Sequence, residues 1–247
     1  MSKRLFPALA ASVTVLACAG AARAADAPKP LRVLVYDVAY SSTTVRREHT
    51  SGFSNSASGI GTGSGSIDRR FGGDDRGTLT VAVVAATAEG GLVVDASFVG
   101  KSITQPVIRV AILKDGSLSY DPKTQPSAQA LRLLPFLSRG LIAERDVNTG
   151  STWSVQAFAP AAGATTYRVT AFDGTRATLE FDESITVKGG SGFTQSAQGK
   201  TVYATDLLSP ISIDLHTIIR RDLSIDLADT TDSRLSATIV SDTFAKR

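Results

Sequence analysis

The sequence predicts a mostly β fold: one curved antiparallel sheet, or open half-barrel, of about a dozen strands with one short helical insert. Three observations lead to this fold. Short runs of β-branched and aromatic residues recur along the chain, glycine-containing turns separate them, and only residues 126–142 have a helical pattern. A chain of 247 residues suits one large domain, which we place at residues 25–247.

Residues 1–24 are predicted to be a signal peptide rather than part of the fold. Lys3 and Arg4 precede an apolar run at residues 5–17, which is too short to span a bilayer. The small-x-small pattern that ends at Ala24 predicts cleavage there. The protein is therefore expected in the periplasm or outside the cell.

Cys18 offers an alternative to this processing. Residues 15–18 resemble the lipoprotein box of bacteria, in which the cysteine becomes a lipidated N-terminus, although Leu16 stands where a small residue is usual. Cleavage after Ala24 is the favoured interpretation. Cys18 is the only cysteine, so after cleavage the chain would have no disulfide, thiol nucleophile or thiolate metal site.

The charge balance argues against a nucleic-acid partner. The 26 lysines and arginines include three within residues 1–24, so residues 25–247 hold 23 of them against 23 aspartates and glutamates. Nucleic-acid binding requires a clustered positive surface, which this balance does not indicate. No later apolar run is long enough for a transmembrane helix.

The first strand is expected at residues 31–40, which are rich in valine and tyrosine, and it continues through residues 41–50 as a polar, β-branched extension. Residues 51–77 are dominated by glycine and serine, so they form either a mobile loop or a thin, weakly specified strand. Residues 78–87 and 92–99 flank a turn at residues 89–91, which predicts a hairpin.

Two Asp-Gly pairs, Asp115-Gly116 and Asp173-Gly174, predict further hairpins, because Asp-Gly supplies the positive φ angles of a type I′ turn. The remaining expected strands cover residues 107–113, 117–120, 167–172, 175–187, 211–220, 223–227 and 235–244. The last two are expected to be joined across residues 228–233.

An internal similarity leaves two interpretations open. Residues 51–59 match residues 191–199 at six of nine positions, on either side of the helical insert. One interpretation is a duplication, with related halves at residues 31–121 and 151–244 joined by the insert. Chance similarity between two polar, small-residue strands is favoured, because the flanking sequences align poorly.

The insert at residues 126–142 has helical signals of its own. Pro126 suits a first helical turn, and Leu131, Leu134 and Leu137 recur near helical spacing. The segment is either a lid that covers an apolar opening or an ordinary core plug.

Two residues are expected to end the helical turns of the insert. Pro135 must kink or split the helix, and Gly140 is a plausible C′ residue that stops it.

The sequence gives no positive support for an enzyme or a metal site. His49 and His216 lie far apart in strand-like runs, and no Gly-x-Ser-x-Gly elbow presents a nucleophile. Asp68, Asp74 and Asp75 flank a glycine-rich turn that either holds calcium or, in the favoured interpretation, is simply solvated. We therefore expect no catalysis, no cofactor and no bound metal.

Adjacent carboxylates do not change this expectation. Asp182 and Glu183 are neighbours in a predicted strand, so their side chains point to opposite faces and cannot act as an acid–base pair.

The stretch that follows the insert carries a family resemblance. Residues 148–153, Asn-Thr-Gly-Ser-Thr-Trp, are similar to a "Gly-Asp-x-Trp" turn in exported bacterial β-rich proteins of unknown function, with Ser151 at the Asp position. The layout of residues 31–244 resembles periplasmic lipoprotein carriers of the LolA/LolB/LppX type. That resemblance implies helices that cover a hydrophobic cavity in a half-barrel, although this chain offers only one kinked segment.

The leading hypothesis is an exported, non-catalytic protein that binds or carries an apolar ligand, such as a lipid, in the cell envelope. The candidate lining residues are Leu131, Leu134, Phe136, Leu137, Leu141, Ile142 and Trp153. The alternative is a structural or interaction module that pairs its sheet edge near residues 51–66 with an envelope protein. A small outer-membrane barrel is disfavoured by the low aromatic content of 6%.

Overall fold

The computed structural model describes residues 29–56, 59–142, 145–157, 161–188, 192–224 and 226–244. The predicted signal peptide and Cys18 lie outside these residues. So do parts of the two similar segments, 51–59 and 191–199, and the possible duplication therefore stays a prediction.

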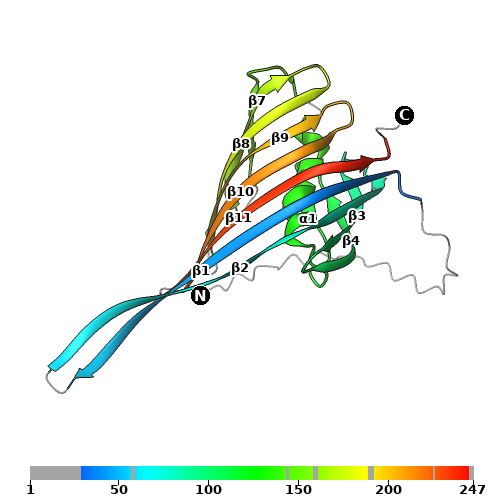
Figure 1. The fold of residues 1–247 in the computed structure, drawn as a ribbon. Coiled ribbons are helices and arrows are strands. Elements are labelled where there is room, and N and C mark those ends of the chain that lie inside the picture. Colours follow the sequence, from blue (N-terminus) through cyan, green and yellow to red (C-terminus); the bar gives the residue numbers. More distant parts are fainter. Residues whose placement is uncertain are drawn as a thin grey trace, which may run out of the picture.

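The chain forms one antiparallel sheet of eleven strands, which confirms the predicted mostly β, open-sheet fold (Figure 1). The strands are β1 Arg32–Ser56, β2 Gly59–Ala86, β3 Leu92–Gly100, β4 Thr104–Ile112, β5 Leu118–Ser119, β6 Thr152–Gln156, β7 Ala161–Phe172, β8 Arg176–Val187, β9 Phe193–Ala204, β10 Ser209–Ser224 and β11 Leu227–Asp242. Their order in the sheet is β5-β4-β3-β2-β1-β11-β10-β9-β8-β7-β6, so β5 and β6 are unpaired edges and the sheet is not closed.

The first and last strands are neighbours in the centre of this sheet. β1 pairs with β11 from Leu34–Asp242 to Glu48–Leu227. All other strand pairs are formed by strands that follow each other in the sequence. The segment between β5 and β6 is therefore the connection between the two edges, and it lies on the inner face around which the sheet curves (Figure 1).

That segment consists of three short helical turns: α1 Ala128–Leu133, η1 Leu134–Leu137 and η2 Arg139–Leu141. The Ser127 side chain caps α1 by accepting the Ala130 amide at 3.1 Å. Pro135 stands in the first turn of η1, so the α-helix ends before it, as predicted. We call α1, η1 and η2 together the helical segment.

Gly140 does not end a helix with a left-handed C′ conformation, so that prediction was wrong. It lies inside η2, where its amide donates to the Lys114 carbonyl at 3.1 Å. A Cβ at this position would lie 2.1 Å from the same oxygen. Glycine is required here because the helical segment touches the β4–β5 turn.

The Asp-Gly hairpins are present, but their turn type differs from the prediction. Gly116 and Gly174 have positive φ angles of 89° and 98°, whereas Asp115 and Asp173 do not. Type I′ requires positive φ at both residues. Here each carboxylate accepts a downstream amide, such as that of Thr175 at 2.9 Å, and this Asx-turn bonding favours the ordinary aspartate conformation.

The C-terminal strands are longer than predicted. β10 continues to Ser224 and β11 begins at Leu227, so the predicted connection at residues 228–233 is wrong. Those polar residues pair with both β1 and β10. β9 was not predicted as a separate strand, because residues 193–204 are mostly small and polar.

β1 and β2 extend past the rest of the sheet as a two-stranded ribbon (Figure 1). The β1–β11 ladder ends at Glu48, and the β2–β3 ladder begins at Gly77. Beyond these limits, β1 and β2 pair only with each other, up to the Ser56–Gly59 pair at the end of the hairpin. We call residues 49–66 the ribbon.

The ribbon resolves the ambiguity about the glycine- and serine-rich stretch. Its described backbone is strand rather than loop. The two arms of this hairpin pair with each other from His49–Ser66 to Ser56–Gly59, so their backbone hydrogen bonds form within the ribbon.

Candidate functional site

The inner face of the sheet is the face that meets the helical segment. Strand register identifies it, because side chains in one row across the strands point the same way. One such row runs through Phe181, Gly199, Leu215, Leu235 and Tyr40. Neighbouring residues along each strand belong to the outer face.

The helical segment fills part of the inner face as core. Leu133, Leu134 and Leu137 are at most 2% exposed, and they belong to one cluster with buried side chains from the strands. Contacts connect α1 to β3 and β11, and η1 to β4 and β10. The helical segment therefore packs as a core plug, which is one of the two interpretations that the sequence allowed; the other was a lid.

The structure brings together most of the predicted lining residues. The half-buried Trp153 packs against the cluster. Five of the predicted residues are buried within it: Leu134, Phe136, Leu137, Leu141 and Ile142. Leu131 is half-buried and is not part of the cluster. Contact between these residues and a ligand stays a prediction.

A series of aromatic rings joins the helical segment to the β6 edge. Phe136 lies 5.2 Å from Phe181, Phe181 lies 5.9 Å from Tyr167, and Tyr167 stacks on Trp153 at 5.6 Å between ring centroids. Burial raises the pKa of Tyr167, and the charge of Glu183 adds to that effect. The Trp153 indole N–H is buried without a hydrogen-bond partner among the described residues.

A recess of about 630 Å³ opens beside this aromatic series. We call it the side recess. The helical segment forms one wall through Pro135 and Leu141, and strands β6–β8 form the other through Val155, Tyr167 and Ile185. Its volume is in the range of small-molecule sites.

A second recess of about 570 Å³ lies at the other end of the helical segment, and we call it the N-cap recess. Tyr40 and Ser42 of β1 face Ser127, Ala128 and Gln129 across it. The two recesses therefore flank the helical segment on either side of the inner face.

Beyond the helical segment, the inner face of the curved sheet continues as a more exposed surface, and we call this part of the face the open trough. Its apolar residues follow from the strand register and are half-buried or exposed: Ile67, Phe71, Ile185, Val187, Phe193 and Ile219. Phe71 remains 50% exposed although it lies on the same face as the fully buried Leu79. The predicted site missed these residues. These residues could have been found from the alternation of apolar and polar side chains along the strands, because the strands are too long for the insert to cover their whole inner face.

Arginines line the open trough. Arg46 forms a bidentate pair with Asp229 at 2.8 Å, and its guanidinium lies 5.6 Å from the Phe71 ring centroid. Arg69 and Arg221 stand in the same row of the inner face as Arg46. The trough is thus amphipathic, with apolar side chains beside basic ones.

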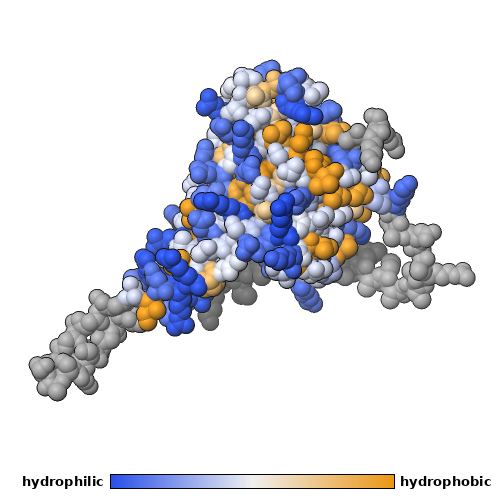
Figure 2. Space-filling model, viewed as in Figure 1, coloured by the Kyte–Doolittle hydropathy of each residue, from blue (hydrophilic) through white to orange (hydrophobic). Residues whose placement is uncertain are grey.

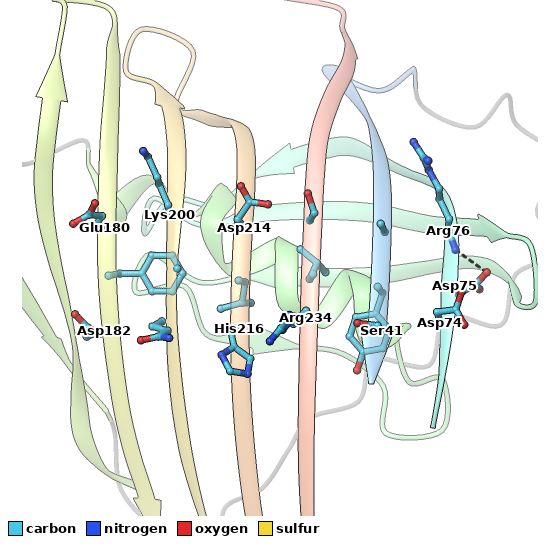
Figure 3. Close-up of a pocket in the computed structure, with 18 residues that line it drawn as sticks. Ser41, Asp74, Asp75, Arg76, Glu180, Asp182, Lys200, Asp214, His216 and Arg234 are labelled. Carbon is cyan, nitrogen blue, oxygen red and sulfur yellow. Dashed lines mark hydrogen bonds between the residues drawn. The ribbon is translucent and has the colours of Figure 1, made fainter. Parts of the chain in front are cut away.

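The outer face carries a different, polar recess of about 890 Å³ (Figure 3). The recess lies between two rows of side chains that point to the outer face. The row between them, from Phe181 to Tyr40, points its side chains to the inner face, so backbone forms the floor of the recess. The labelled polar residues of the outer rows are Ser41, Asp74, Arg76, Glu180, Asp182, Lys200, Asp214, His216 and Arg234. Charged side chains of both signs alternate there.

On the face that Figure 2 shows, hydrophilic and apolar residues are mixed. Hydrophilic residues dominate near the base of the ribbon, and apolar residues lie between polar ones higher on the sheet (Figure 2). Asp182 lies on the outer face and Glu183 on the inner one.

The histidines do not share a site. His216 lies on the outer face with its Nε2 atom 3.0 Å from Asp232 Oδ1, and His49 is exposed near the start of the ribbon. Among the described residues, no group of three or more His, Cys, Asp or Glu side chains is arranged to hold a metal ion.

The aspartates considered for calcium lie in strand β2, so the predicted solvated turn is wrong. Asp68 pairs with Arg47, and Asp75 is 7% exposed. Asp75 accepts the amides of Arg76, Ser102 and Ile103 at 3.0–3.2 Å. Its carboxylate thus stabilises the turn between β3 and β4 by accepting two of the turn's backbone amides.

No helix in the described ranges is both long enough and apolar enough to cross a membrane.

No protein-family model and no curated protein matches the chain. Among solved structures, the chain is similar to one described as lipid–protein interactions in lipovitellin, with 10% sequence identity and a TM-score of 0.44. The match covers 88% of this chain and 26% of that chain, so this chain spans about a quarter of its length. The resemblance to periplasmic lipoprotein carriers stays a prediction from the sequence.

Proposed function

We propose that this is an exported, non-catalytic protein that binds an apolar ligand, such as a lipid, on the inner face of its sheet. The observation that supports the proposal is the open trough. Its side chains continue the face that forms the core, yet residues such as Phe71 remain exposed. An apolar face that the described residues leave exposed is typical of a binding surface.

The side recess supplies the enclosed part of this site. It adjoins the trough through Ile185, which lines the recess and points to the inner face. An apolar ligand in the recess would contact Leu141 and Tyr167, with Trp153 stacked behind Tyr167. The helical segment then acts as a fixed wall of the site.

The ligand itself can be sought directly. Organic extraction of the purified protein, followed by mass spectrometry, is expected to release a lipid or another apolar compound. The neutral dye Nile red is expected to bind the extracted protein with increased fluorescence. A protein that yields no such compound and does not bind the dye would contradict the proposal.

A pair of variants locates the binding surface. Ile185→Glu places a charge in the side recess and is expected to weaken Nile red binding at least about tenfold, because the charge must be desolvated on binding. Val240→Glu adds the same charge at a 67% exposed position of β11, outside the recess. Equal loss in both variants would place the dye elsewhere.

Export is the second part of the proposal. The predicted product begins after Ala24, so the protein from the periplasmic fraction should have an N-terminus there. Detection of a lipid-modified Cys18 would favour the lipoprotein alternative instead.

The ribbon supports a second candidate function, a protein-interaction module of the envelope. In the described residues beyond Glu48 and before Gly77, no third strand of the sheet pairs with this hairpin. Unpaired strand edges can add a strand from a partner.

Shortening the ribbon separates the two functions. Thr50 and Gly65 are paired, so an Asn-Gly turn can replace residues 51–64. The shortened protein is expected to keep Nile red binding and, under the interaction hypothesis, to lose a partner that crosslinks to the full-length protein in cells. Retention of that partner would remove the ribbon from consideration.

A further inference from the structure

Arg132 is a charged residue whose side chain has no hydrogen-bond or ion-pair partner among the described residues. It lies in the last turn of α1 and is half-buried. Within the described chain, no hydrogen bond or ion pair involves it. A guanidinium in this position has lost part of its hydration and has gained no ion pair with a described residue, so it is suited to an external anion.

The surroundings of Arg132 place it between the two recesses. Tyr40, Glu183 and Arg221 are the groups whose charges act on it. Tyr40 lines the N-cap recess and Glu183 lines the side recess. Arg221 stands in the open trough, so Arg132 lies where the helical segment meets the trough.

Glu183 acts on Arg132 through its negative charge, but no ion pair joins the two side chains among the described residues. Its two carboxylate oxygens accept hydrogen bonds from Thr165 Oγ1 at 3.0 Å and Gln195 Nε2 at 2.5 Å. These bonds hold the carboxylate on the β7–β9 side of the face. Burial lowers the pKa of Arg132, whereas Tyr40 and Glu183 oppose that effect.

Arg221 is the second unpaired cation of the trough. Its neighbours in the row are paired, since Arg46 binds Asp229 and Arg69 lies 3.7 Å from Glu48. The Arg221 side chain lies opposite Asp229 and acts on it through its charge, but it forms no hydrogen bond or ion pair in the part of the chain that the structure describes. Arg132 and Arg221 thus offer two unpaired guanidinium groups to one apolar surface.

We propose that Arg132 and Arg221 bind the anionic head group of a single-chain amphiphile, whose hydrocarbon chain lies in the open trough. This inference rests on the proposed function and specifies its ligand class. Guanidinium groups bind carboxylate and phosphate oxygens through paired, charge-assisted hydrogen bonds. From Phe71 to Ile67 the trough spans roughly 13 Å of strand, which accommodates much of a fatty-acyl chain.

Three ligands with the same hydrocarbon chain test the proposal: oleate, oleyl phosphate and oleyl alcohol. Each is titrated against Nile red bound to the purified full-length protein, below the critical micelle concentration. At least one of the two anions is expected to displace the dye at about tenfold lower concentration than the alcohol. The stronger of the two distinguishes a fatty-acid carboxylate from a phosphate head group.

Arg132→Gln is expected to remove that preference, with about tenfold weaker binding of the preferred anion and unchanged binding of the alcohol. Arg132→Lys keeps the charge and should retain part of the preference. Arg234→Gln, on the outer face, is the matched control and should behave as wild type. Circular dichroism checks that each variant is folded.

The outcomes separate the two levels of the argument. Binding of all three ligands with equal strength, or an unchanged anion preference in Arg132→Gln, would overturn the head-group inference and leave apolar binding in place. If none of the three displaces Nile red and the dye itself does not bind, the proposed function fails as well.

Discussion

Arg32 of β1 and Asp242 of β11 form a buried ion pair that joins the first strand of the sheet to the last. The Arg32 Nε atom lies 3.0 Å from Asp242 Oδ1, and a second guanidinium nitrogen contacts Oδ2. Arg32 also donates to the Leu207 carbonyl and to Ser209 Oγ, at 2.6 and 2.8 Å. The Phe244 ring covers the guanidinium at 5.2 Å, so all of its partners come from the C-terminal part of the chain.

Removal of one partner from this pair should strongly destabilise the fold. Asp242→Asn leaves the Arg32 charge buried without a counter-ion, and we expect a loss of about 3–5 kcal/mol in the free energy of unfolding. Urea denaturation measures it. Asp37→Asn breaks the exposed pair with Arg76 and should have no measurable effect. A similar result for both variants would contradict the structural role of the buried pair.

The same carboxylate makes stability depend on pH. Burial alone would raise the pKa of Asp242, but hydrogen bonds from Arg32 and the Phe244 amide, with the Arg32 charge, hold it below its usual value. Its contribution is therefore complete above the unfolded-state pKa of about 3.9 and is lost as pH falls through the lower folded-state pKa. Urea unfolding between pH 6 and 2.5 should show this loss, and Asp242→Asn should make the acid dependence shallower. An equally steep dependence in the variant would exclude Asp242 as its source.

Replacing each of two buried tyrosines by phenylalanine is expected to have different effects on stability. Tyr36 and Tyr203 are both fully buried, but among the described residues only the Tyr36 hydroxyl has a hydrogen-bond partner, the Pro210 carbonyl at 3.1 Å. Tyr36→Phe should cost about 1–2 kcal/mol, because it leaves a hydrogen bond unmade. Tyr203→Phe removes an unpaired hydroxyl and should be neutral or stabilising. Thermal unfolding of both variants decides the matter, and a larger loss for Tyr203→Phe would contradict it.

Gly163 is a position where the backbone excludes any side chain. Its φ angle is 130°, and a Cβ would lie 1.9 Å from the Ser184 carbonyl oxygen on β8. Gly163→Ala should destabilise the protein by about 2 kcal/mol or more. Gly73→Ala is the control, since a Cβ there would meet nothing within 4 Å. Equal denaturation midpoints for the two variants would contradict this geometry.

Leu134 tests whether the helical segment is core or lid. Because the side chain is fully buried, Leu134→Ala should cost about 2–5 kcal/mol. Leu131→Ala, at a half-buried position outside the core cluster, should cost less. A lid that is open much of the time would instead show a small cost for Leu134→Ala and fast amide exchange throughout α1.

The sequence predicted the fold class well because alternating strands and one kinked apolar insert are local patterns. Pro135 was predicted to split the helix, and α1 ends before it, whereas Pro126, predicted in the first helical turn, lies before the Ser127 cap and outside the helix. The pairing of β1 with β11 could not be predicted in this way. It joins residues about 200 positions apart, such as Arg32 and Asp242, and no local pattern marks it.

The candidate site was predicted only in part. Leu134 and Phe136 were recognised as apolar, but apolarity does not distinguish a residue that fills a core from one that lines a cavity. The trough residues Phe71 and Ile219 belong to strands whose inward or outward direction depends on register. Arg132 was not considered, because only the structure shows that it is half-buried and unpaired.

The adjacency of β1 and β11 has a consequence for how the polypeptide could be rewired. Phe244 lies against Arg32, so a short linker could join these ends, and a new start could be placed in the helical segment. In such a permuted chain, β6 to β11 and then β1 to β5 would follow one another in the order they occupy in the sheet. Every strand pair would become a hairpin, with short loops to close during folding. In the natural connectivity, by contrast, the central β1–β11 pair can form only after nearly the whole chain has been synthesised, because it joins the first strand to the last.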